Sequence, residues 1–103
     1  MDIREIEAFA QQEDIRLRAS YPGLTDTEFL YAKTVKCGEE LGELCQAVLA
    51  SAGHQRREKD VPDPASEFAD VIITAFLVAH SLGIDATSAL RHKFSVIEER
   101  HSG

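Results

Sequence analysis

Five acidic residues fall into two short groups with helical spacing. Glu39, Glu40 and Glu43 form the first group, and Glu67 and Asp70 form the second. Acids three positions apart lie on the same side of a helix, so each group can direct two carboxylates to one place. Carboxylate oxygens are the ligands that hard divalent cations such as Mg²⁺ prefer. The spacing therefore indicates a metal site shared by two helices.

Apolar residues around the first group indicate where its carboxylates lie. We expect Glu40 and Glu43 at the margin of an apolar stripe, facing the edge of the core. Glu39 lies about 100° further round the helix, within reach of the same cavity. The stripe consists of Cys37, Leu41, Leu44 and Val48.

The second group stands at the entrance of a strongly apolar helix. The run from Val71 to Ala79 is apolar nearly all round, which is typical of a helix buried on more than one side. Ionised Glu67 and Asp70 need counter-charge in such a setting. One acid pair alone more often belongs to a solvated helix face. Two pairs beside apolar surfaces, on helices packed antiparallel, favour divalent cations together with a phosphorylated ligand.

Helix start and stop signals predict the elements that carry these acids. We expect an all-α fold, with a polar loop over 53–63 that has no periodic apolar pattern. The predicted N-caps are Asp2, Thr25, Asp63 and Asp85. Gly83 is expected to end the third helix. The predicted helices cover 2–19, 25–51, 64–82 and 86–101.

Length, composition and charge restrict the class of protein. The 103 residues support one domain, 1–103, and the hydrophobic fraction of 44% with 28% charged residues is typical of a folded chain. A formal charge of −7 argues against binding along a nucleic-acid backbone, which needs a basic stripe. A nucleotide is compatible with this charge only if cations neutralise some carboxylates.

The sequence predicts neither a membrane partner nor a disulfide. Val71 to Ala79 is too short to cross a bilayer, and the N-terminus lacks a basic start followed by an apolar run. A cytoplasmic location is the resulting expectation. Cys37 and Cys45 lie roughly 12 Å apart along a helix, too far to be bridged, so we expect two reduced, buried thiols.

The two acidic groups, taken in order, resemble the signature of the MazG-like all-α nucleoside triphosphate pyrophosphohydrolases. That signature is EExxE followed by ExxD, and here it covers 39–43 and 67–70 with 23 residues between. The resemblance extends roughly from Tyr31 to Arg100. It implies a four-helix, MazG-like bundle assembled as a homo-dimer or homo-tetramer. The supporting segments are Gly42-Glu43-Leu44, Leu82-Gly83-Ile84-Asp85, Lys93-Phe94 and Arg100.

The resemblance also implies a reaction and a set of site residues. The reaction is hydrolysis of a nucleoside triphosphate between the α and β phosphates, giving a nucleoside monophosphate and pyrophosphate. Mg²⁺ is the implied cofactor, with Mn²⁺ as a possible substitute. Glu39 is the implied catalytic residue, which orients or deprotonates the attacking water. The implied metal ligands are Glu40, Glu43, Glu67 and Asp70.

Basic residues are candidates for holding the triphosphate. Lys33 and Lys36 share a face with the first acidic group, so either can reach a phosphate or pair with an acid, and we favour Lys36. By resemblance, Lys93 and Arg100 bind the triphosphate from the last helix. The chain departs from the family pattern at Ile97, where many relatives carry asparagine.

Two alternatives to the enzyme stand beside this hypothesis. A catalytically silent module of the same fold would bind metal or nucleotide for assembly or regulation, and Ile97 motivates it. A di-iron bundle needs Glu-x-x-His motifs, and no such histidine follows either acid pair. The third helix has more apolar circumference than a monomer this small readily covers, which predicts a helical dimer.

Overall fold

The computed structural model describes residues 1–52 and 63–102, and these residues form four helices and no strand. This confirms the predicted all-α fold with four helices. The loop predicted over 53–63 lies, except for Asp63, outside the described residues. The helices are α1 (Ile3–Ser20), α2 (Asp26–Ser51), α3 (Pro64–Leu82) and α4 (Ala86–Ser102).

Capping groups set the ends of the helices where the sequence predicts them. Each predicted N-cap accepts a backbone N–H with its side chain, at 2.9 to 3.3 Å. Gly83 ends α3 in the left-handed region, at φ 67°, where a residue with a β-carbon is strained. The four N-caps are Asp2, Thr25, Asp63 and Asp85.

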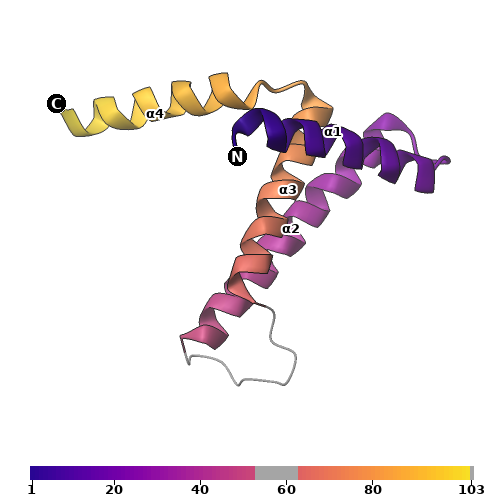
Figure 1. Cartoon of the computed structure of the whole chain (residues 1–103), viewed down its shortest axis with the longest axis horizontal. Helices are drawn as coiled ribbons and strands as arrows, with labels where there is room; N and C mark the ends of the chain where they lie inside the picture. The colour runs from indigo at the N-terminus through magenta and orange to yellow at the C-terminus, as the bar shows by residue number, and fades with distance from the viewer. Residues whose placement is uncertain (53–62, 103) are drawn as a thin grey trace.

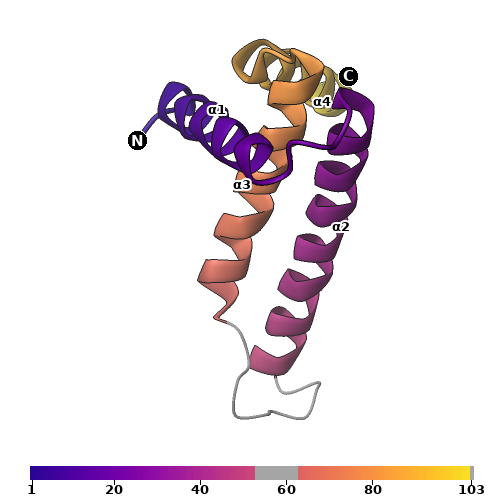
Figure 2. The ribbon, with the colours of Figure 1, turned by 90° about the vertical axis from the view of Figure 1, so that its right-hand side faces the viewer.

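A hairpin of two helices forms the body of the molecule. In both views α2 and α3 run side by side in opposite directions, and α1 crosses the end of the hairpin where α3 finishes (Figures 1 and 2). Helix α4 leads away from the hairpin, and its main contacts are with α1 (Figure 1). The α2–α3 interface is therefore the place where distant parts of the sequence meet.

The core of a single chain is thin. The radius of gyration is 16.5 Å, against about 13 Å for a compact domain of this length. Only six apolar residues are buried among those described, and four of them are alanines. Large apolar side chains on every helix remain exposed. A single chain thus leaves much apolar surface uncovered.

Two expectations about α2 are wrong. Leu41 and Val48 of the predicted core stripe are exposed, and Cys45 is exposed as well, although both cysteines are free as predicted. Helix α2 turns a different face toward α3, and Glu40 lies on that face rather than at its margin. Since α3 covers only one side of α2, Leu41 and Val48 of the expected stripe stay exposed among the described residues.

Helix α3 is long and apolar enough to cross a membrane, judged by its length and composition alone. It has 19 residues, more than the apolar run counted in the sequence, because its polar first turns are included. Buried core helices of soluble proteins pass the same test. Within this chain α3 is also the helix that both α1 and α2 pack against.

Candidate metal centre

Three of the predicted acids converge between the two helices of the hairpin. One carboxylate oxygen each from Glu40, Glu67 and Asp70 lies within 4.8 Å of the others. Glu40 comes from the middle of α2, while Glu67 and Asp70 come from the first turns of α3. Glu40 and Glu67 are only 6% and 7% exposed, and Asp70 is partly exposed. We call these three residues the acid cluster.

Among the described residues, Lys36 is the one cation paired with an acid of the acid cluster. Glu40 Oε1 pairs with Lys36 Nζ at 3.1 Å, but Glu40 Oε2 and Glu67 Oε2 are buried with no hydrogen-bond partner among the described residues. Buried polar atoms in native proteins are normally hydrogen-bonded, so the two unpartnered oxygens require an explanation.

The pKa of Glu67 is shifted by the same burial and by the neighbouring acids. Burial raises this pKa above its usual value, and so do a hydrogen bond with Glu43 and the charges of Glu43, Asp70 and Glu40. Glu43 itself is exposed, yet this hydrogen bond places its carboxyl group beside the acid cluster. Three of the four predicted metal ligands form the acid cluster, whereas exposed Glu43 acts on the pKa of Glu67 without belonging to the acid cluster.

Lys36 and Glu39 occupy the open side of the acid cluster. Lys36 Nζ lies 3.1 Å from Glu40 and 3.8 Å from Glu39, and both Lys36 and Glu39 are more than half exposed. The ion pair with Glu40 is the main cause that raises the pKa of Lys36. Lys36 thus lies between Glu39 and the acid cluster, to which Glu39 does not belong.

The two basic residues predicted from the last helix lie elsewhere. Lys93 and Arg100 are exposed on α4, which begins only after α3 has run about 20 Å beyond Glu67. Helix α4 then leads away from the hairpin (Figure 1). A single chain does not bring these two residues to the acid cluster.

A second buried polar group lies at the other end of the α2–α3 interface. Lys33 Nζ donates to Asp14 Oδ1 at 2.5 Å and also to the Ser81 hydroxyl, joining α1, α2 and α3. We call Asp14, Lys33 and Ser81 the ionic clasp. Arg18 Nε donates to the other oxygen of Asp14 at 3.0 Å, and Lys33 Nζ lies 4.7 Å from the Phe29 ring centre.

The ionic clasp decides between the two lysines considered as phosphate ligands. Lys33 is 6% exposed and committed to Asp14, so Lys36 is the lysine available at the acid cluster. The clasp was missed because its partners are 19 and 48 positions apart. One signal was present: Asp14 follows Ala10 by four positions and precedes Leu17 by three, which places it on the inward face of α1.

The donor set of the acid cluster fits a hard divalent cation. Carboxylate oxygens around one Mg²⁺ lie about 3 to 4 Å apart, as follows from octahedral ligand distances near 2.1 Å. The three oxygens lie within 4.8 Å of one another, so small side-chain rotations bring them to ligand distance. A cation there would also give the two unpartnered oxygens a partner.

Comparison of the chain with models of known protein families, with curated proteins and with solved structures finds no match.

Proposed function

We propose that the chain is a Mg²⁺-dependent nucleoside triphosphate pyrophosphohydrolase of the MazG-like all-α type, a hydrolase acting on acid anhydrides. The observation that carries the proposal is the pair of buried, unpartnered carboxylate oxygens on Glu40 and Glu67, one from each helix of the hairpin. A site that keeps such groups buried is suited to a cation, and a cation beside exposed Lys36 is suited to phosphates.

Four acids would hold the cation. Glu40, Glu67 and Asp70 supply the converging oxygens, and Glu43 supplies a further carboxylate at the edge. When bound, Mg²⁺ or its substitute Mn²⁺ neutralises phosphate charge and lowers the pKa of water. The partly exposed position of Asp70 leaves one side of the acid cluster open to a substrate.

Lys36 and Glu39 would carry the remaining chemistry. Lys36 pairs with Glu40 here, and its exposed ammonium group can turn to the triphosphate and stabilise negative charge on it. Glu39 would orient a water molecule and accept its proton. The water oxygen forms a bond to the α phosphorus, the bond from that phosphorus to the bridging oxygen breaks, and pyrophosphate leaves.

A second copy of the chain completes this proposal. We propose a homo-dimer or homo-tetramer, because the chain is extended and its apolar side chains are largely uncovered. In such an assembly Lys93 and Arg100 of one copy would approach the acid cluster of another. Light scattering tests this step, since a monomeric mass at working concentration would contradict it.

Pyrophosphate release tests the activity directly. Purified protein with Mg²⁺ and each nucleoside triphosphate in turn should release pyrophosphate, and Glu43→Gln should abolish that release because it removes a charged ligand without changing volume. Glu98→Gln, an exposed acid on α4, is the matched control and should retain the activity. Absence of pyrophosphate with every nucleotide would contradict the enzyme.

A catalytically silent module of the same fold is the second candidate. Ile97 favours it, because this residue stands where many members of the resembled family carry an asparagine and its side chain is partly exposed on α4. Calorimetry separates the two candidates. Nucleotide binding in the presence of Mg²⁺, without pyrophosphate release, would support the silent module.

A further inference from the structure

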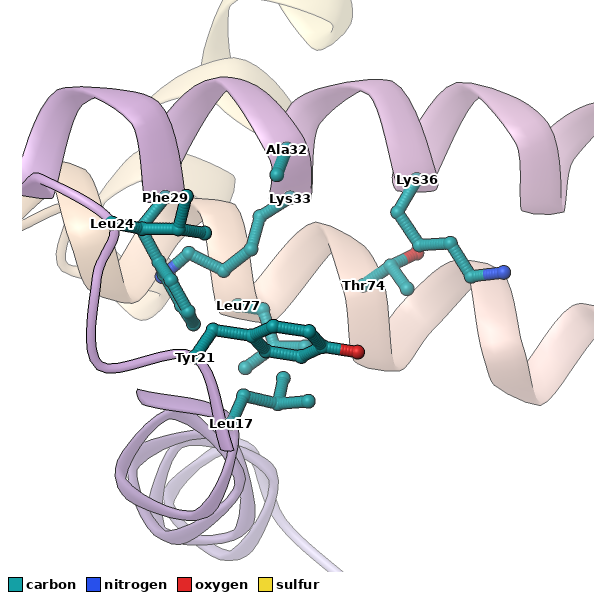
Figure 3. Close-up of a pocket in the computed structure, with 9 residues that line it drawn as sticks. All are labelled: Leu17, Tyr21, Leu24, Phe29, Ala32, Lys33, Lys36, Thr74 and Leu77. Atoms are coloured by element: carbon teal, nitrogen blue, oxygen red, sulfur yellow. The ribbon is translucent and has the colours of Figure 1, made fainter. Parts of the chain in front are cut away.

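An apolar hollow of about 430 Å³ lies beside the acid cluster, between the α1–α2 turn and α3 (Figure 3). Its volume falls within the range of small-molecule sites, roughly 300 to 1,000 Å³. Side chains from three helices and from the turn form its walls, and nearly all of the lining surface is carbon. The apolar walls are Leu17, Tyr21, Leu24, Phe29 and Leu77.

Lys36 connects one end of the hollow to the acid cluster, although no residue of the acid cluster lines the hollow itself. Lys36 and Thr74 line that end (Figure 3). Lys36 Nζ lies 3.1 Å from Glu40 Oε1, and the Thr74 hydroxyl donates to the Asp70 carbonyl oxygen at 2.8 Å. A molecule that fills the hollow therefore ends beside Lys36, next to the carboxylates.

The polar atoms of the hollow are mostly engaged by the protein itself. Lys33 Nζ is held by Asp14 and Ser81, and the Thr74 hydroxyl is held by backbone oxygens. The Lys36 ammonium group is paired with Glu40 but is more than half exposed, and Figure 3 shows the Tyr21 hydroxyl group directed toward the Lys36 side. The deeper part of the hollow thus offers apolar surface and an aromatic ring, but few hydrogen bonds.

We propose that this hollow is the nucleoside subsite, and that it selects the base by stacking and shape rather than by hydrogen bonds to the base edge. The proposal rests on the proposed function, because the triphosphate is then directed toward Lys36 and the acid cluster. The ring of Tyr21 offers a face on which any base can stack. A site without hydrogen-bonding groups for the base edge discriminates weakly among bases.

Kinetics with an abasic substrate tests the subsite. We expect the four deoxynucleoside triphosphates to differ by no more than about tenfold in kcat/KM. Tyr21→Ala should reduce the preference for deoxynucleoside triphosphates over ribose 5-triphosphate by about tenfold, because stacking on an aromatic ring stabilises a bound base by that order. Tyr31→Ala is the matched control, an exposed tyrosine of α2 outside the hollow, and should leave the preference unchanged.

A preference that Tyr21→Ala leaves intact would overturn the subsite, and so would discrimination of a thousandfold or more between two bases. A shift of the Tyr21→Ala variant to a lower oligomeric mass, with its substrate preference intact, would assign the hollow to a second copy of the chain instead. Light scattering on both tyrosine variants provides that measurement.

A binding measurement separates failure of the subsite from failure of the proposed function. Thymidine, which has no phosphate, should shift the NMR signals of Tyr21 and Leu24 in the wild type and in Glu67→Gln, but should shift no signal of Leu24 in Tyr21→Ala. Thymidine binding without hydrolysis of any triphosphate would retain the subsite and reject the enzyme. Hydrolysis without these shifts would retain the enzyme and reject the subsite.

Discussion

The α2–α3 interface contains two buried polar groups that differ in charge balance. In the ionic clasp, Asp14 is paired with Lys33 and Arg18, and these hydrogen bonds lower its pKa although burial alone would raise it. In the acid cluster, two carboxylate oxygens have no partner among the described residues, and the pKa of Glu67 is raised. Along the same pair of helices, the acids are paired with cations in the ionic clasp, whereas negative charge is in excess in the acid cluster.

The comparison gives a criterion for telling buried charges that stabilise the fold from buried charges that bind a ligand. A buried ion pair with satisfied hydrogen bonds can persist as part of the fold, whereas buried like charges need a counter-charge or a bound proton. The clasp joins α1 to the hairpin and needs no ligand. The acid cluster has two buried oxygens without a partner among the described residues, which is why we propose a cation there.

The largest expected effect comes from unbalancing the clasp. Lys33→Met leaves buried Asp14 without its closest cation, and we expect the free energy of unfolding to fall by about 3 to 5 kcal/mol. Urea denaturation measures this change. Lys36→Met removes a lysine that is more than half exposed, so solvent screens its pairing with Glu40 and the loss should be smaller than for Lys33→Met. Equal losses in both variants would remove the distinction between the two polar groups.

Neutralising the acid cluster should have the opposite effect on stability. Glu67→Gln removes one of several repelling acids, so without divalent cations the free energy of unfolding should rise, while pyrophosphate release falls on the order of 100-fold or more. Denaturation in a chelator and a pyrophosphate assay give the two readouts. A variant that is less stable than the wild type in a chelator would show that Glu67 is a structural residue.

Magnesium should stabilise the chain through the acid cluster alone. At 100 times its dissociation constant, a ligand that binds only the folded state stabilises it by about 2.7 kcal/mol, so Tm should rise on addition of Mg²⁺. Glu40→Gln should lose most of this rise and Asp14→Asn should keep it. Calorimetric scans with and without Mg²⁺ compare the variants. A rise that survives Glu40→Gln would place the cation elsewhere.

The smallest expected effect is the pH dependence of the clasp. Because the pKa of Asp14 is lower in the folded chain, its ionised form stabilises the fold above about pH 4, and this contribution is lost as the pH falls through the lowered value. The basic groups that face Asp14 are Lys33, Arg18 and His80. The stability difference between wild type and Asp14→Asn should therefore shrink on acidification, as measured by denaturation. A constant difference would contradict the pairing.

The sequence predicts the local features of this fold well, because they depend on neighbouring residues. Thr25 and Glu28 cap each other, Gly83 stops α3, and acids three positions apart share a face, all within one helical turn. These rules predict where the helices begin and end and which acids share one face of a helix.

Two other features that depend on distant residues were not predicted. The clasp joins Lys33 to residues 19 and 48 positions away, and no local pattern pairs them. The face that α2 turns toward α3 was also misjudged, since Leu41 and Val48 look more suited to a core than Glu40. Hydrophobicity alone ranks residues for burial, while packing of only two helices covers only one face of each.

The left-handed turn at Gly83 has a consequence for the size of the particle. This turn sets the direction in which α4 leaves the hairpin. It therefore also decides which neighbouring copy α4 can reach in the proposed assembly. If two copies each pack α4 against the other, the assembly closes as a dimer. If α4 of each copy packs against a third copy instead, the assembly stays open and can keep growing. A β-carbon at this one position would redirect α4 and change which of these outcomes the geometry allows.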